Sequence, residues 1–293
     1  MIVIARSYGQ LGNRLFVYAH FIAAARAYGV PLANPCFAEY ADFFPATAHD
    51  LWCRYPRPSV DSRPPSAGRR KMLAKGIYLT ARLLSMAGLT RYPFQVLRIK
   101  GEQIYDLGSD EFANASRDDR HLLAMGWLFR SESLLRQHAD AVRSHFQIAQ
   151  PHRDRVDRLI ASIRRGADVI VGVHIRHGDY ATFMNGRYFY SVQQYAAAMQ
   201  SIAQQLPGKR IAFLVCSNVK VERSDFGDLQ VHFGPGHIIE DMYAMAEADL
   251  LVGPPSTYTG WASFYGNVPL LEMRTDEPIK VIATRPSPVS RVA

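Results

Sequence analysis

The chain alternates short apolar runs with longer stretches in which apolar residues recur at helical spacing. The run Val169–Ile175 is continuous and rich in β-branched residues, which is typical of a strand buried on both faces. Ser191 and Gln194 form a capping-box pattern that predicts a helix to about Leu206. Further strands are predicted at 211–216, 229–233, 249–253 and 268–273, and a further helix at 240–248. Strands that alternate with helices predict an α/β fold with parallel sheets.

The first half of the chain opens with the same alternation. Residues 2–5 predict a strand, and a helix is predicted over 14–28 with Asn13 as its N-cap. Gly9 and Gly12 lie between the two elements, so a ligand can approach the helix N-terminus, which favours anions and hydroxyls. We include Gly9, Gly12 and Asn13 among the expected ligand-binding residues. The alternative is a tight strand-to-helix connection with no ligand.

The chain is long enough for two domains. Pro151 interrupts the pattern after a helix that ends near Phe146, and a basic helix follows. We therefore place the boundary within 147–168 and expect domains at 1–160 and 161–293. A hydrophobic content of 48% is that of an ordinary globular protein.

Targeting and redox signals favour the cytoplasm. The first residues lack the basic region and cleavage site of a secretory signal peptide, and no apolar run is long enough to span a bilayer. Cys36, Cys53 and Cys216 are odd in number, with no CxxC motif, which favours a reducing compartment. No zinc-like spacing and no D-x-D motif is present, and we expect no metal and no cofactor.

The net charge of +8 is concentrated in one segment. Residues 53–100 hold eleven Lys or Arg against one acid, Asp61, and 72–89 have the pattern of an amphipathic basic helix. One interpretation is a solvated basic loop beside a packed helix. The other is peripheral contact with an anionic membrane, here the inner membrane surface. We expect no nucleic-acid partner, because no recognised binding motif accompanies the charge.

Polar side chains follow two of the predicted strands. Arg176, His177 and Asp179 come directly after the strand 169–175, and Ser256 and Thr257 come after the strand 249–253. The carboxyl ends of parallel strands form one edge of a sheet, where ligands bind. A guanidinium fork, hydroxyl groups and a helix N-terminus all suit phosphate oxygens. The pattern predicts an anion site. The alternative for the Ser-Thr pair is a helix N-cap, which its convergence with Arg176 at one sheet edge disfavours.

Four segments carry a resemblance to a known family. GQLGNRLFVYA at 9–19, GWLFRSESLL at 126–135, GVHIRHGDY at 172–180 and EDMYAMAEADLLVGPPSTYTGWASFYG at 240–266 resemble the α-1,2-fucosyltransferases of glycosyltransferase family 11. They resemble the α-1,6- and protein O-fucosyltransferases more distantly. The match covers nearly the whole chain, in the right order, except for the basic segment.

The resemblance implies a GT-B architecture, in which two Rossmann-like domains face each other across a cleft. The N-terminal domain would bind the glycan acceptor and the C-terminal domain the nucleotide sugar GDP-fucose. The implied reaction is metal-independent, inverting transfer of L-fucose to a galactose hydroxyl in α-1,2 linkage. In a bacterium this reaction would serve surface polysaccharide synthesis.

The resemblance also implies residue roles. Arg176 would bind the β-phosphate and stabilise the leaving GDP, and His174 would help to place the nucleotide. Asp241 would accept hydrogen bonds from guanine. Ser256 and Thr257 would complete the diphosphate site.

Some positions stay open. Asp179 either contacts the donor or orients Arg176, and Tyr180, Tyr188 and Tyr190 either line a sugar pocket or pack in the core.

One departure from the family pattern concerns the donor. His177 stands where the family has a second consecutive arginine, so a transferase for another GDP-sugar and an inactive nucleotide-sugar-binding protein remain as alternatives. The sequence does not identify a base for the acceptor hydroxyl. His20, Glu39 and Asp42 are candidates, and the leaving phosphate itself is another.

Overall fold

The computed structural model consists of two compact units, Met1–Ala149 and Gln150–Ala293, each described here by itself. It describes all residues except 60–62, 102, 275–278, 282–283 and 285–293. The division falls inside the expected segment 147–168 but before residue 160, because the helix α7 (Gln150–Arg164) packs within the second unit against α9 (Ile238–Met245).

The first unit is built on a mixed sheet with the strand order β3-β2-β1-β6-β4. All neighbours are parallel except the β2–β3 pair at one edge. Its strands are β1 (Ile2–Ile4), β2 (Leu32–Ala33), β3 (Arg54–Tyr55), β4 (Gln95–Arg98) and β6 (Leu122–Met125), with β5 (Tyr105–Asp106) and β7 (Phe129–Arg130) forming a separate pair. Its helices are α1 (Leu11–Tyr28), α2 (Pro45–Ala48), α3 (Ala67–Met86), α4 (Asp110–Arg117), α5 (Glu132–Gln137) and α6 (Ala139–His145), with short 3-10 turns η1 (Pro35–Phe37) and η2 (Ala41–Phe43).

Helix α1 begins earlier than the sequence pattern indicated. Its N-cap is Gln10, so the expectation that Asn13 caps this helix is wrong, and Asn13 lies in the first turn. The cause is Gly9, whose φ of 60° turns the chain before Leu11, and Leu11 is fully buried as part of the helix. A side chain at position 9 would also meet the Asn13 amide, 2.1 Å from an ideal Cβ.

The second unit contains a five-stranded sheet in which every pair is parallel, with the order β10-β9-β8-β11-β12. Its strands are β8 (Val169–Ile175), β9 (Ile211–Ser217), β10 (Val231–Phe233), β11 (Leu250–Gly253) and β12 (Leu270–Glu272). Its remaining elements are α8 (Val192–Gln204), α10 (Thr257–Gly266), η3 (Gly178–Ala181), η4 (Phe183–Gly186) and η5 (Arg223–Phe226). The mixed α/β class with parallel sheets is confirmed.

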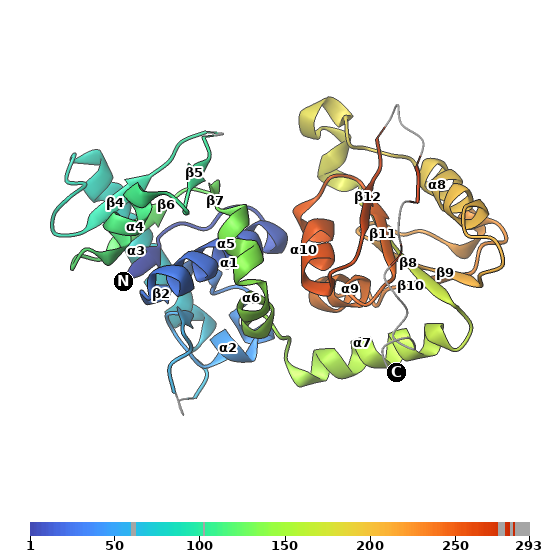
Figure 1. Cartoon of the computed structure of the whole chain (residues 1–293), viewed down its shortest axis with the longest axis horizontal. Helices are drawn as coiled ribbons and strands as arrows, with labels where there is room; N and C mark the ends of the chain where they lie inside the picture. The colour runs from blue at the N-terminus through green and yellow to red at the C-terminus, as the bar shows by residue number, and fades with distance from the viewer. Residues whose placement is uncertain (60–62, 102, 275–278, 282–283, 285–293) are drawn as a thin grey trace. The chain divides into compact units, whose positions relative to one another are not determined.

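Successive residues of β8 point to opposite faces of this sheet. Val171, Val173 and Ile175 belong to the core cluster shared with α8. Gly172 and His174 face the other side, which α9 and α10 cover (Figure 1). The predicted capping box is confirmed, since Ser191 and Gln194 each accept the backbone N–H of the other. Among the helices of the described residues, none is both long and apolar enough to cross a bilayer.

Close packing of α10 on α9 yields the first prediction. An ideal Cβ on Gly266 would lie 1.9 Å from the Ala246 carbonyl oxygen, a backbone atom that cannot rotate away. Gly266→Ala should therefore lower the free energy of unfolding by about 2–3 kcal/mol. The measurement is urea unfolding followed by circular dichroism.

Gly76→Ala is the matched control, because Gly76 also lies in a helix but has open space around its Cβ position. It should raise stability by up to about 1 kcal/mol. Equal behaviour of the two variants would refute the close α9–α10 contact.

Candidate functional site

The candidate site lies at the carboxyl edge of the second unit's sheet. Strands β8 and β11 are neighbours there, but the chain leaves β8 toward β9 on one side and reaches β12 from β11 on the other. Such a reversal of strand order opens a crevice beyond the strand ends, where open α/β sheets bind ligands. The loops after the two strands are joined directly, because the Tyr180 hydroxyl donates a hydrogen bond of 2.9 Å to the Pro255 carbonyl.

Arg176 follows β8 at this edge. Its Nη2 lies 2.8 Å from Asp179 Oδ1, and its guanidinium stacks over Tyr180 with 5.3 Å between Cζ and the ring centroid. The Asp179 side chain is 60% exposed, so solvent weakens this ion pair. Asp179 thus orients the guanidinium, while the other guanidinium N–H groups of Arg176 form no hydrogen bond within the described part of the chain. They are available to an anion.

The N-terminus of α10 lies at the end of β11. Ser256 is the N-cap, and its hydroxyl accepts the Tyr258 N–H at 3.2 Å. Thr257 is the first helical residue, and the first N–H groups of a helix have no partner inside it. Both interpretations of the Ser-Thr pair are thus compatible, since a hydroxyl that caps the helix leaves the N–H of Thr257 and the helix dipole to attract an anion.

His174 lies on β8 and is buried where this strand faces α10. Its Nδ1 lies 2.8 Å from Thr259 Oγ1, and its ring centroid is 4.9 Å from that of Tyr258. Burial, and then the charge of Arg176, lower the pKa of His174 to about 3. The imidazole is therefore neutral near pH 7 and a weak base. Its contacts fix the first turn of α10 against the sheet, which is a positioning role.

His177 is held by Asn218, which follows β9, and by Tyr190, which precedes α8. Its backbone N–H donates to Asn218 Oδ1 at 2.8 Å, and its Nε2 lies 2.8 Å from the Tyr190 carbonyl oxygen. A carbonyl only accepts, so Nε2 carries the proton. In this tautomer the other ring nitrogen, Nδ1, is an acceptor and offers no hydrogen bond to a phosphate.

Asp241 lies on α9 with 7% of its surface exposed. Its Oδ1 accepts the Gly236 N–H at 3.1 Å. An ideal Cβ on Gly234 would lie 2.6 Å from the same oxygen, so a glycine is needed beside it. Burial, with a further contribution from the charge of Glu240, raises the pKa of Asp241 to about 6. A carboxylate that is shielded from water to this degree strongly favours a ligand that donates hydrogen bonds to it.

Glu240, the preceding residue, anchors α9 to α7. His152 Nδ1 and Arg155 Nη1 lie 2.8 and 2.7 Å from Glu240 Oε1. Burial alone would raise the pKa of Glu240, but these two partners outweigh it and hold the pKa below the ordinary value. We call His152, Arg155 and Glu240 the α7–α9 clip. It fixes the helix that carries Asp241.

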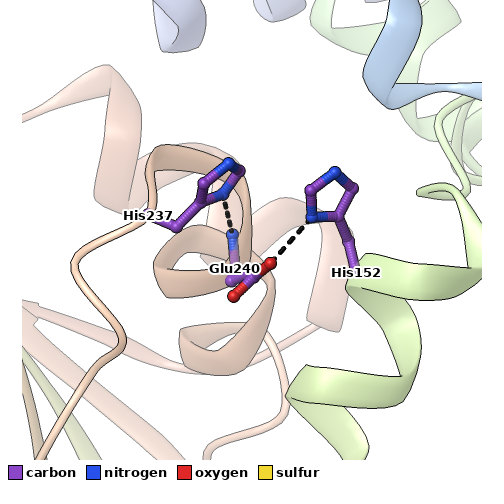
Figure 2. Close-up of side chains that lie close together, drawn as sticks. All are labelled: His152, His237 and Glu240. Carbon is purple, nitrogen blue, oxygen red and sulfur yellow. Dashed lines mark hydrogen bonds and ion pairs between the residues drawn. The ribbon is translucent and has the colours of Figure 1, made fainter.

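His152, Glu240 and the N-cap residue His237 are also the one group of potential metal ligands among the described residues, with ligand atoms within 4.8 Å (Figure 2). Their sequence spacing did not indicate such a group. Arg155 already places a positive charge on the carboxylate, and His237 Nδ1 accepts the backbone N–H groups of Ile239 and Glu240 at 3.3 and 3.4 Å. We therefore interpret His152 and Glu240 as part of the α7–α9 clip and His237 as the N-cap of α9, rather than the three as a metal site.

The three expected ligand residues of the first unit surround one turn. Gly9 has φ of 60°, Asn13 lies against it, and Gly12 is buried in the first turn of α1. Arg14 Nε donates to the Gly9 carbonyl at 3.1 Å and its Nη1 lies 3.0 Å from Glu39. This loop follows β1 at the carboxyl edge of the first unit's sheet.

Each of the three candidate bases has a defined partner. His20 accepts the Ser131 N–H at 3.1 Å, and burial lowers its pKa to about 4. Glu39 pairs with Arg14. Asp42 is 3.5 Å from Arg70 but 72% exposed. None is distinguished as a catalytic base.

Several site residues were missed from the sequence. Tyr258 donates to the Ile238 carbonyl at 2.7 Å and so ties α10 to α9, Thr259 holds His174, and Asn218 holds His177. Polar residues at the end of β9 and directly after the Ser-Thr pair were the available signal. Tyr190 is 3% exposed and donates to the Met273 carbonyl at 2.7 Å, so it packs in the core.

The fold is shared with structures of known proteins. FUT1 of Arabidopsis thaliana, a point mutant in complex with GDP, has 14% identity and a TM-score of 0.62 over 97% of this chain and 75% of that one. The fucosyltransferase NodZ from Bradyrhizobium has 16% identity and a TM-score of 0.56 over 97% and 99%. POFUT1 in complex with GDP-fucose has 12% identity and a TM-score of 0.51 over 90% and 93%.

No family model and no curated protein matches the chain at the sequence level. At these identities the structural similarity establishes the fold, which is GT-B-like as expected.

The environment of Asp241 yields a stability prediction. An ordinary Asp has a pKa of 3.8, and burial raises the pKa of Asp241 to about 6 in the folded chain. Below both pKa values the carboxyl group is protonated in the folded and the unfolded chain, so its burial adds no electrostatic cost to folding. Above pH 6 it is ionised in both, and the full free-energy cost of burying the carboxylate opposes folding. Asp241→Asn should raise the free energy of unfolding near pH 7.5 by about 1–3 kcal/mol, and much less near pH 4.5. Urea unfolding at the two pH values is the measurement.

Asp179→Asn is the control, because Asp179 is exposed and has one ion pair. Its effect should be within about 0.5 kcal/mol at both pH values. A lower free energy of unfolding for Asp241→Asn at neutral pH would contradict the interpretation that burial of the ionised carboxylate destabilises the fold.

Proposed function

We propose that this protein is an inverting glycosyltransferase that moves L-fucose from GDP-fucose to a galactose hydroxyl in α-1,2 linkage. One observation carries the proposal, which is that three polar groups lie at the carboxyl edge of one parallel sheet. Arg176 follows β8, the N-terminus of α10 follows β11, and Asp241 lies beside Gly234, which follows β10. It is supported by similar structures that hold GDP or GDP-fucose, and by NodZ, an α-1,6-fucosyltransferase.

The donor site follows from the chemistry of GDP. The diphosphate carries negative charge, and Arg176 with the N–H groups at Thr257 supplies a guanidinium fork and a helix dipole. Guanine has two adjacent donors, N1–H and the exocyclic amine, which fit the two oxygens of the Asp241 carboxylate. Ser256 and His174 hold these groups in place through Tyr258 and Thr259.

The reaction places the main demand on the leaving group. The acceptor hydroxyl attacks C1 of fucose from the face opposite GDP, and the electron pair of the C1–O bond passes to the β-phosphate oxygen. Negative charge grows on that phosphate in the transition state, and Arg176 and the α10 N-terminus stabilise it without a metal. The hydroxyl proton leaves to a base or to the departing phosphate.

The two units divide the substrates in this proposal. The second unit binds the donor, and the first binds the glycan acceptor. Gly9, Gly12 and Asn13 are proposed as further donor-binding residues. The acceptor is a surface polysaccharide precursor, and the enzyme works in the cytoplasm. The alternative is a different GDP-sugar, which the single arginine beside His177 favours; an inactive nucleotide-sugar-binding protein is the second alternative.

A donor panel tests the proposal. GDP-fucose, GDP-mannose and UDP-galactose are offered with lactose-type acceptors, and the release of nucleoside diphosphate and the linkage of the product are measured. We expect turnover with GDP-fucose, thermal stabilisation by GDP but not by UDP, and no change on adding EDTA. Turnover with GDP-mannose alone would establish the first alternative, and GDP binding without any turnover the second.

The same assay extends to Arg176. Arg176→Ala should lower kcat by about 10²- to 10³-fold, because one transition-state donor is lost. Arg187→Ala is the matched control, since Arg187 lies in the same loop and stacks over Tyr188. Unchanged kcat in Arg176→Ala would remove the phosphate role.

Asp241 gives a separate test on binding. Guanine needs the ionised carboxylate, so the affinity for GDP should fall as the pH drops through about 6. Asp241→Asn should bind GDP at least about tenfold more weakly near pH 7.5 and lose the pH dependence. Isothermal titration calorimetry measures both, and an unchanged affinity in the variant would overturn the guanine contact.

A further inference from the structure

Helix α3 has two apolar faces, and one of them points into solvent. The inward face carries Ile77, Ala81 and Leu84, which pack in the core of the first unit. The outward face carries Met72, Leu79, Leu83 and Met86, with exposed fractions of 73%, 41%, 64% and 66%. Spacings of seven, four and three residues place these four on one side of the helix. We call them the α3 ridge.

The helix is firmly attached, so the ridge is not the product of a loose segment. Arg70 is 1% exposed, and its guanidinium donates to the carbonyl groups of Asp50 at 2.8 Å and Thr47 at 3.2 Å. This basic residue therefore serves the packing of α3. The other basic residues of the helix point outward.

Positive charge flanks the ridge along its length. Lys71, Lys75 and Arg82 are exposed and lie on one flank by helical spacing, and Arg69 is exposed on the other. Residues 67–100 contain no Asp or Glu. A single exposed apolar residue is ordinary, but a row of four bordered by one sign of charge marks an interaction surface.

The charges select the occupant. A second copy of the chain would bring the same basic flanks against each other, which costs energy in a two-fold interface. An anionic lipid surface meets both features, since acyl chains accept the ridge and headgroups pair with the lysines and arginines. We propose that α3 lies in the plane of an anionic membrane and attaches the first unit to it.

The proposal concerns a surface of the first unit and stands apart from the donor chemistry. It is tested with the full chain by co-sedimentation with vesicles of phosphatidylcholine alone, or with about 30% phosphatidylglycerol. We expect binding to the anionic vesicles only, with strong loss as salt rises from roughly 0.05 to 0.5 M. Absence of binding to anionic vesicles at low salt would overturn the proposal.

Paired variants separate the ridge from its charges. Lys75→Gln with Arg82→Gln should weaken the vesicle partition coefficient about 25-fold, at about fivefold per charge. Arg158→Gln with Arg165→Gln removes the same charge from exposed positions of the second unit and should change it less than about twofold. Equal losses in both pairs would mean a response to net charge alone and would refute docking through α3.

Leu83→Gln with Met86→Gln tests insertion of the ridge. It should weaken binding about tenfold or more, whereas Ile104→Gln, at another residue 66% exposed, should not. Each variant must retain the circular dichroism spectrum and the thermal unfolding midpoint of the parent chain, which together report an intact fold. Sedimentation without vesicles completes the test: a dimer lost in Leu83→Gln with Met86→Gln would assign the ridge to a second copy and reject the membrane.

Discussion

The direct parallel pairing of β8 with β11 is the constraint on which the candidate site depends. The paired residues of the two strands are 79 positions apart in the chain, yet the ladder places Val173 beside Val252. Because the two strands are parallel, both end at the same edge of the sheet, so the loop with Arg176 and the start of α10 become neighbours. The Tyr180 to Pro255 hydrogen bond then holds two loops that the sheet has already brought together.

Buried charge in this unit is distributed unequally between two consecutive residues. Glu240 contacts His152 and the cationic Arg155, so its burial is compensated and it fastens α9 to α7. Asp241 accepts hydrogen bonds from the backbone at Gly236 and His237, but burial and the neighbouring negative charge of Glu240 outweigh them and raise its pKa. The α7–α9 clip therefore stabilises α9, the helix that also carries Asp241, whose burial costs folding free energy. Such an arrangement is what a binding site needs, because the uncompensated group stays available to a ligand.

The sequence was sufficient to predict the elements whose signals lie in neighbouring residues. β8, the Ser191–Gln194 box and the Ser256 cap are encoded by neighbouring residues, so periodicity and capping chemistry located them. The start of α1 was misplaced because Asn13 is a better cap by composition than Gln10, while burial of Leu11 and the turn at Gly9 decide the outcome. Tertiary burial overrode the local preference.

The partners of the site residues were beyond that reasoning. Thr259 and Asn218 hold the two histidines through contacts 85 and 41 residues apart, and His152 meets Glu240 over 88. No single-sequence pattern links such positions. The basic segment shows the same limit: its amphipathic pattern was visible, but only burial of Arg70, Ile77 and Ala81 reveals that the helix has a second apolar face left in solvent.

The dry carboxylate also explains how such a site would select its nucleotide. A pocket that hydrogen-bonds a ligand rejects an analogue without the donors far more strongly than an apolar pocket rejects a missing methyl group, because the buried acceptor is left unpaired. Guanine satisfies both oxygens of Asp241, whereas uracil presents one ring N–H between two carbonyl oxygens that repel a carboxylate. Under the proposed function, the same desolvation that destabilises the free fold thus enforces the choice of GDP over UDP, while Arg176 and the α10 N-terminus, which contact only phosphate, cannot tell the two apart.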